Sequence, residues 1–507
     1  MNTKLLNVAA FLLLATMLVT ASCKRHKEDP APKETTVAGP NLNLFGITKT
    51  NELVAFNAST PGTSTKNAIT GLVAGETLLS IDFRPSTGEL YALSSASKLY
   101  IVNTTTYAAR VVGTAAFAPA ISGTVVSIDF NPTVDRLRLV SNNGQNLRLN
   151  PETGAVAATD IPINGGSSPA ISGLAYSNSK AGAATTVFYA IDQTTAKLYE
   201  VNPPNNGVLV EKGNLGITFT GQAAFDISGD NTAALIAAKV NGVNTLYLLD
   251  VATAVATKIA TTKEELIDIA IPTEAVAYSV DAANNLLIYN PEATTPSVTS
   301  KAITGLQPAE TIQGIDFRPL NGQLYALGST SRVYTINATS GAAVQVGTGT
   351  FSTMLNGTDF GFDFNPTVDR IRVVSNLGQS MVLNPMDGTV ASVSPMINPG
   401  LPMVSSAAYA NNFAGATTTV FYVLDHNTDR LYTQSPATST ITDIGPLGIN
   451  IDGSNGFDIG STTGKAYLVA TVGGANRIYS VNLTSGATTS MGTLTTAVKG
   501  FTVGTGF

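Results

Sequence analysis

The chain has 507 residues, of which 44% are hydrophobic and 12% charged, and its formal net charge is −6. This size and apolar content allow two or more domains with large cores, and no basic stripe is present, which argues against a nucleic-acid-binding protein. The single cysteine excludes an intramolecular disulfide, and only two histidines exclude a zinc site built on several His and Cys ligands. Gly, Thr, Ser and Asn outnumber Glu, Lys and Arg, which favours strands and turns over exposed helices.

The N-terminal stretch has the composition of a secretion signal. "MNTKLLNVAAFLLLATMLVTASC" combines Lys4, an apolar run and small residues before Cys23. Its end resembles a bacterial lipobox. We therefore expect a lipoprotein signal peptide over 1–22, lipidation of Cys23 as a membrane anchor, and a flexible tether over 23–42. A plain signal peptide with an incidental cysteine is the alternative. Lys24 favours the bacterial outer membrane, and exposure at the cell surface stays open.

Several motifs recur later in the chain, in the same order and at a nearly constant offset. "DFNPTVDR" begins at Asp129 and at Asp363, an offset of 363 − 129 = 234. "VFY" recurs at an offset of 420 − 187 = 233, and "FDI" at 457 − 225 = 232. This pattern indicates a tandem duplication, with predicted domains over 43–272 and 273–507.

Each half contains a shorter repeat. "SIDFRPSTGELYALS" from Ser80 and "SIDFNPTVDRLRLVS" from Ser127 both predict two short strands joined by a Pro-containing turn. A third apolar strand such as "KLYIVN" and then a fourth follow each pair. The repeats begin about 46 residues apart, which is the size of a four-stranded propeller blade.

We therefore predict an all-β fold of two tandem five-bladed β-propellers. The segments Glu265–Pro272 and Lys499–Phe507 are expected to supply the inner strand that completes the first blade of each half. Such a strand closes the ring and leaves only short, protected sheet edges. The alternative is one ring of about ten blades, in which 265–272 joins the two halves.

These ordered motifs resemble a known bacterial family. The combination "ITGL…SIDFRP.TGELYAL…SIDFNPTVDRLRLVSN.GQ.LRLNP…VFYAID…LY.V" is similar to the domain of unknown function number 4394, over both halves. The resemblance implies a secreted or surface β-propeller module. It implies no particular reaction and no catalytic residues.

The repeated octapeptide is a candidate for chemistry or for folding. We expect Asp129 on an inner strand, Asn131–Pro132 at the turn, and Asp135 accepting N–H groups within it. Arg136 and Arg138 would then be partly buried and pair with Asp129 or Asp135. The same structural roles are expected in the second half for Asp363, Asp369, Arg370 and Arg372.

Two further expectations concern this octapeptide. Its sibling "DFRPSTGE" is predicted to form the same turn without the octapeptide's charges. As an alternative to the ion pairs, the oxygens of Asp129, Asn131 and Asp135 could hold a Ca²⁺ ion, although their spacing lacks the usual calcium-loop pattern.

The loop that follows the octapeptide is polar in both halves. From Asp129 to Pro151, 17 of 23 residues are identical in the second half, including most of "SNNGQ" and "SNLGQ". In a propeller this loop lies on the face that usually binds ligands. The ligand-binding candidates are therefore Ser141, Asn142 and Gln145, with Ser375, Asn376 and Gln379. The alternative is a turn whose side chains cap the backbone.

Acids recur on the predicted inner strands. They are Asp82, Asp129, Asp226 and Asp268 in the first half, and Asp316, Asp363 and Asp458 in the second. Carboxylates around one channel could bind a cation or form a glycosidase pair. Their recurrence in nearly every blade favours a structural role, in which each acid anchors a turn or a hydrogen bond between blades.

Three functions are compatible with this sequence. The first is a lipid-anchored extracytoplasmic propeller that binds a protein or a glycan at the cell envelope. The second is a propeller hydrolase or lactonase with a channel metal, and the third is a purely structural surface protein. No acid or histidine stands out from the repeat as a catalytic group would, which favours binding over catalysis.

Overall fold

The computed structural model describes residues 35–165 and 168–507. The predicted signal peptide, Cys23 and most of the predicted tether lie outside these residues. The described chain forms ten four-stranded antiparallel sheets and one short 3-10 turn, η1 (Pro204–Asn206). No helix among the described residues has the length and apolar character needed to cross a membrane.

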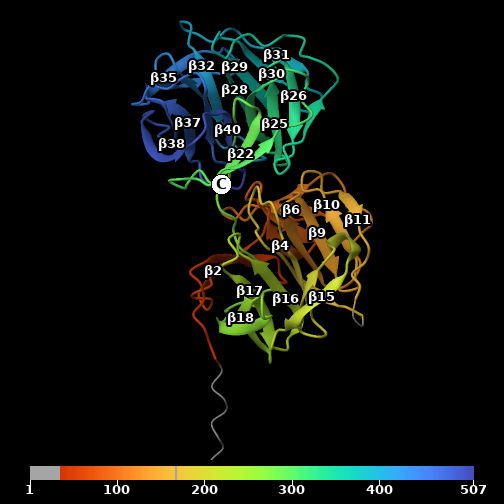
Figure 1. Ribbon diagram of the computed structural model, residues 1–507. Coiled ribbons are helices and arrows are strands. Elements are labelled where there is room, and N and C mark those ends of the chain that lie inside the picture. Colours follow the sequence, from red (N-terminus) through yellow and green to blue (C-terminus); the bar gives the residue numbers. More distant parts are fainter. Residues whose placement is uncertain (1–34, 166–167) are drawn as a thin grey trace, which may run out of the picture. The chain divides into compact units, whose positions relative to one another are not determined.

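The first five sheets contain β1 to β20 and form one ring, coloured from red to green in Figure 1. The inner strands β20, β4, β8, β12 and β16 contact one another around the axis. From inner to outer strand, the blades are β20 (Asp268–Ala270), β1 (Asn43–Ile47), β2 (Glu52–Asn57) and β3 (Ser64–Ala68); β4 (Leu78–Phe83), β5 (Leu90–Ser94), β6 (Leu99–Val102) and β7 (Ala109–Val112); β8 (Val126–Asn131), β9 (Arg136–Ser141), β10 (Asn146–Leu149) and β11 (Val156–Thr159); β12 (Ile171–Tyr176), β13 (Phe188–Asp192), β14 (Lys197–Val201) and β15 (Leu209–Asn214); and β16 (Thr220–Ile227), β17 (Ala234–Val240), β18 (Val243–Asp250) and β19 (Val255–Thr261).

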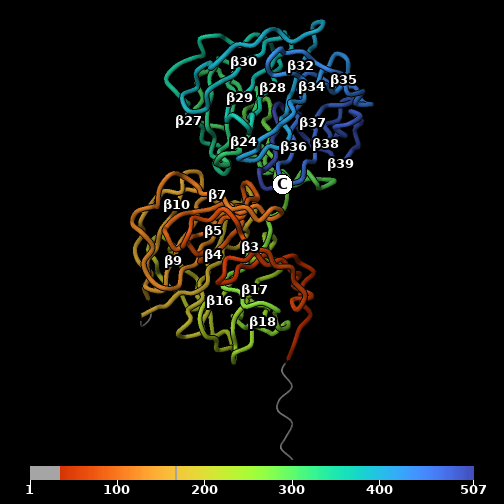
Figure 2. Tube along the Cα trace, turned by 180° about the vertical axis from the view of Figure 1, so that it is seen from behind, coloured from red at the N-terminus to blue at the C-terminus, as the bar shows by residue number. Residues whose placement is uncertain are grey.

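The other five sheets contain β21 to β40 and form a second ring, coloured from green to blue in Figure 1 and seen from behind in Figure 2. Its blades, again from inner to outer strand, are β40 (Lys499–Val503), β21 (Ala277–Val280), β22 (Asn285–Tyr289) and β23 (Thr299–Ala302); β24 (Ile312–Arg318), β25 (Gln323–Gly328), β26 (Arg332–Ile336) and β27 (Ala343–Val346); β28 (Phe360–Asn365), β29 (Arg370–Ser375), β30 (Ser380–Leu383) and β31 (Val390–Val393); β32 (Val404–Tyr409), β33 (Phe421–Asp425), β34 (Arg430–Gln434) and β35 (Ile441–Pro446); and β36 (Asn455–Ile459), β37 (Ala466–Val472), β38 (Ala475–Val481) and β39 (Thr488–Leu494).

Each half closes its own ring. Strand β20, from the end of the first half, pairs antiparallel with β1 and places Asp268 opposite Ile47. Strand β40, near the C-terminus, pairs with β21 and places Thr502 opposite Tyr278. The prediction of two five-bladed propellers is therefore confirmed, and the single ring of about ten blades is excluded.

The core lies between neighbouring blades, because both faces of each sheet are covered. In β9, Leu137 and Leu139 are fully buried and pack in one cluster with Tyr91 and Leu93 of the preceding blade. The rings of Tyr91 and Phe130 meet edge to face, with centroids 5.1 Å apart. Alternation along each strand therefore buries one set of side chains against each neighbour, which explains the nearly continuous apolar strands.

Candidate ligand-binding site

The recurrent inner-strand acids join neighbouring blades. Asp82 of β4 accepts the backbone N–H of Phe130 in β8 at 2.6 Å, and Asp268 of β20 accepts that of Ile81 in β4 at 2.9 Å. Every one of the seven acids makes such a bond to the next inner strand or, for Asp226, to the residue that follows it. The remaining pairs are Asp129 with Tyr176, Asp226 with Ile271, Asp316 with Phe364, Asp363 with Tyr409, and Asp458 with Val503.

These carboxyl groups lie close together on each axis and are fully buried. In the first ring, oxygens of Asp82, Asp129 and Asp226 lie within 4.8 Å of one another. Burial raises the pKa of Asp226 and of Asp268 to about 7. Burial and then repulsion by Asp226 raise the pKa of Asp82 well above its usual range. Protons therefore neutralise part of this cluster near neutral pH.

The second ring has a hydroxyl among its axial acids. Gly500 corresponds to Asp268, and Thr502, two residues further along β40, places its Oγ1 atom 3.0 Å from Asp316 Oδ1 and 2.9 Å from Asp458 Oδ2. A hydroxyl has one hydrogen, so one of these two contacts requires a protonated carboxyl group. Burial accordingly raises the pKa of Asp458 to about 7.

The octapeptide forms the predicted turn, but its ion pairs differ from those expected. Asp135, in the left-handed region with φ of 50°, binds Arg84 of the sibling motif with both oxygens, at 2.9 and 2.5 Å. The side chains of Arg84 and Asp135 are almost completely buried. The expectation that the sibling turn works without charges is therefore wrong, because it supplies the cation that the octapeptide's acid requires.

The octapeptide's own arginines bind partners other than the expected carboxylates. Arg138, on the second strand, reaches outward and binds Asp160 at 2.6 Å. Arg136 donates to the backbone oxygen of Asp135 at 2.7 Å. Asp129 instead accepts the Tyr176 N–H, so the expected pairing of these arginines with Asp129 or the Asp135 carboxylate is wrong. The reason is position, since the inner strand lies at the axis and the arginines extend toward the rim.

The second half repeats this arrangement with less burial. Asp369 binds Arg318, which corresponds to Arg84, through both oxygens. Arg370 donates to the backbone oxygen of Asp369 at 2.9 Å. Arg372 has no acid at the Asp160 position and donates to the Ser394 hydroxyl at 2.8 Å.

The proposed Ca²⁺ ligands are not gathered at one point. Asp135 binds Arg84, Asn131 accepts the N–H and hydroxyl of Thr133 within the turn, and Asp129 belongs to the axial cluster. These oxygens have separate partners that explain their positions in the turn. The geometry therefore offers this Ca²⁺ alternative no support.

The "SNNGQ" loop forms hydrogen bonds with the segment that leads into β8. Asn142 Oδ1 accepts the N–H of Thr124 at 3.0 Å, and Gln145 Oε1 accepts that of Ser122 at 2.8 Å. Ser141 Oγ accepts the N–H of Gln145 at 3.2 Å. The second half makes the same bonds with Ser375, Asn376 and Gln379. These contacts account for the repetition of the loop, and direct ligand binding by these six residues stays a prediction.

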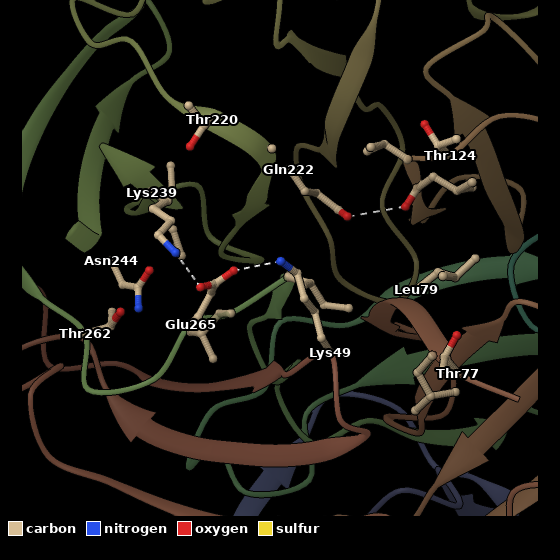
Figure 3. Close-up of a pocket in the computed structure, with 18 of the residues that line it drawn as sticks. Lys49, Thr77, Leu79, Thr124, Thr220, Gln222, Lys239, Asn244, Thr262 and Glu265 are labelled. Atoms are coloured by element: carbon tan, nitrogen blue, oxygen red, sulfur yellow. Dashed lines mark hydrogen bonds and ion pairs between the residues drawn. The ribbon is translucent and has the colours of Figure 1, made fainter. Parts of the chain in front are cut away.

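A pocket of about 380 Å³ lies where the inner strands of the first ring begin. Its walls come from the starts of β4, β8 and β16, the segment before β20, the β1–β2 turn, and the β17–β18 hairpin. Leu78 and Val126 give it apolar walls. Its polar lining includes the side chains of Thr77, Thr124, Thr220, Thr262, Gln222 and Asn244, which Figure 3 labels.

Two amide side chains show how the pocket is organised. Gln222 of β16 donates to the Val126 oxygen of β8 at 3.3 Å, so it bridges two strands that are not neighbours in the ring. Within the described residues, the buried Oδ1 atom of Asn244 has no hydrogen-bond partner. Buried polar atoms without partners are uncommon, and this one lies in the wall of the pocket.

The charged part of the pocket is a triad that we call the mouth triad: Lys49, Lys239 and Glu265. The two oxygens of Glu265 each bind one ammonium group, Lys49 at 2.8 Å and Lys239 at 2.7 Å (Figure 3). Hydrogen bonds from Lys239 and Lys49 lower the pKa of Glu265 to about 2, so it is ionised at neutral pH. The mouth triad therefore carries a net charge of +1.

The second ring lacks the charges of this mouth. Phe360 stands where the first ring has Val126, and further along the inner strands it lines, with Phe501, a cavity of only about 10 Å³. Ala497 replaces Glu265, and Lys499, which corresponds to Ile267, donates to the Thr358 oxygen at 2.8 Å. The charged mouth is thus a property of the first half and not of the fold.

The sequence-based reasoning missed the mouth triad and Gln222. The recurrent motifs singled out residues that the two halves share, whereas the mouth triad and Gln222 are residues in which the halves differ. Aligning the halves for differences on the inner-strand side would have found them. Of the predicted candidates, Asn142 lies behind the pocket, since it holds Thr124 and Val125 in its wall.

Two closed rings of five four-stranded blades define the chain as a tandem β-propeller protein. Comparison with known families places it more narrowly. The family model described as domain of unknown function DUF4394 matches residues 52–270 and 285–502, and the chain belongs to this family.

The chain is also similar to solved structures from B. thetaiotaomicron. One is the extracellular domain of a hybrid two-component system, with 13% identity, a TM-score of 0.26, and coverage of 91% of this chain and 66% of that one. Another is described as the extracellular domain of a one-component system, with 12% identity, a TM-score of 0.24, and coverage of 90% and 66%. The chain thus spans slightly less than two thirds of their length. No curated protein matches it.

Proposed function

We propose that the chain is an extracytoplasmic binding protein of the bacterial cell envelope, anchored through Cys23, that binds a glycan at the mouth of its first propeller. The pocket described above carries this proposal. Its volume of about 380 Å³ falls in the range of small-molecule sites. Its threonine hydroxyls and amide groups provide the donors and acceptors that sugar hydroxyls require, beside apolar walls.

The other functions have weaker support. The axial acids, which a metal-dependent hydrolase would use, are already engaged in joining the blades. A purely structural role would not explain why the first ring has a charged mouth where the second has Ala282, Thr471 and Ala497. A protein ligand would reach the same mouth through a loop, and the experiment below distinguishes it from a glycan.

The test is a glycan array probed with the full chain in detergent, followed by calorimetry on each glycan bound. Thr77→Trp would fill the pocket with an indole ring and is expected to weaken binding at least about tenfold. Thr311→Trp is its matched control, because Thr311 is the equivalent exposed residue of the second ring.

Unchanged binding to Thr77→Trp would place the site elsewhere. An empty glycan array, together with an envelope protein whose capture Thr77→Trp abolishes, would show that the ligand is a protein and overturn the glycan proposal.

A further inference from the structure

The mouth triad has a net positive charge, although the chain as a whole is acidic. Lys49 lies in the β1–β2 turn, Lys239 near the end of β17, and Glu265 before β20, so three separate segments bring these charges together. The side chain of Lys49 is 72% exposed and that of Lys239 39% exposed, so a ligand can reach both.

Both ammonium groups have more N–H donors than Glu265 can accept. An ammonium group has three N–H donors. In the part of the chain that the structure describes, Glu265 is the acceptor shown for both Lys49 and Lys239. One carboxylate therefore serves two cations, and a second anionic group between them would make the arrangement electrically neutral.

The fold does not require these charges. At the equivalent positions the second half has the uncharged Ala282, Thr471 and Ala497, while the neighbouring Thr77 and Thr124 are matched by Thr311 and Thr358. The second ring closes without the mouth triad. The triad therefore belongs to the pocket, and its role is to be sought in the ligand.

We propose that the glycan bound at this mouth is acidic, and that its anionic group lies against Lys49 and Lys239, opposite Glu265. This inference rests on the proposed function and specifies its ligand class. The shared chemistry is a carboxylate or sulfate group on a sugar, either of which accepts hydrogen bonds from ammonium groups. The polar lining and Asn244 then contact the sugar hydroxyls.

The test is calorimetry of the full chain with trigalacturonate, with galactotriose as its neutral counterpart and with a sulfated galactose oligosaccharide. At least one acidic ligand is expected to bind about tenfold more tightly than galactotriose, and the preference should shrink at high salt. The relative affinities for carboxylate and sulfate identify the anionic group.

Three variants sharpen this test. Lys49→Met and Lys239→Met retain the aliphatic stem and should each reduce the acidic-over-neutral preference about threefold or more. Glu265→Gln should increase the preference, because it removes the competing carboxylate. Lys197→Met is the control, since Lys197 pairs with Glu211 on another blade.

Two failures can be told apart. Equal affinity for acidic and neutral sugars, or a Glu265→Gln variant that loses the preference, would overturn the acidic ligand but leave glycan binding intact, provided that Thr77→Trp still blocks it. Absence of binding by any of the three sugars, or binding that Thr77→Trp does not weaken, would overturn this inference together with its basis.

Discussion

The axial acids make stability depend on pH in a direction opposite to that of ordinary surface carboxylates. Asp268 is buried, and its pKa rises from 3.8 to about 7, mainly through the cost of burying its charge. At about 1.4 kcal/mol per pKa unit, this corresponds to about 4 kcal/mol. The folded state holds the proton more tightly, so this stabilisation is fully present below pH 4 and is lost as pH rises toward 7.

The second ring suggests the substitution that tests this. Asp268→Thr introduces a hydroxyl like that of Thr502, which lies among the axial acids of the second ring and accepts the Phe317 N–H at 3.4 Å. The variant keeps an acceptor between blades and removes one buried carboxyl group. Relative to the parent, its free energy of unfolding should rise by about 3 kcal/mol between pH 5 and pH 8.

Urea unfolding followed by tyrosine fluorescence at the two pH values measures this difference. Asp443→Asn is the control, because Asp443 is exposed and Arg430 lowers its pKa, so its effect should be below about 1 kcal/mol and opposite in sign. If Asp268→Thr changed stability equally at both pH values, the axial acids would not be protonated near neutrality and the reasoning would be refuted.

Three further predictions concern other parts of the chain. Asp135→Asn should lower the free energy of unfolding by about 3–5 kcal/mol, because it leaves Arg84 buried without that anionic partner. Asp369→Asn should cost less in the same urea assay, since Asp369 is 32% exposed, and equal losses would contradict the burial argument. Asn142→Ala should weaken glycan binding severalfold in calorimetry by releasing Thr124 from the pocket wall, whereas the matched Asn376→Ala in the second ring should leave affinity unchanged. Cys23→Ser should abolish palmitate labelling and move the protein out of the membrane fraction; a labelled, membrane-bound variant would refute lipidation at this residue.

The fold was predictable because its determinants are repeated in the sequence. Two copies of "DFNPTVDR" revealed the duplication, and an unpaired strand motif at the end of each half predicted ring closure. The recurrence of one acid per inner strand also indicated its structural role, and the observed hydrogen bonds between blades explain it.

Partners across blades were harder to predict. Asp135 binds Arg84 and Arg138 binds Asp160, and both pairs depend on how neighbouring strands and blades are placed in space. Repetition shows that a residue is needed, but it does not show which side chain it meets. The mouth triad was missed for the opposite reason, since Glu265 in one half corresponds to Ala497 in the other and so escapes any search for shared motifs.

The central claim is that the first ring, and not the second, binds the ligand at its mouth. Amide hydrogen exchange of the full chain, with and without the glycan selected on the array, tests it most directly. We expect slower exchange at 220–222 and 265–267, which line the pocket, and unchanged exchange at the equivalent 452–454 and 497–499. Protection confined to the second ring, or to the blade edges of the first, would contradict the claim.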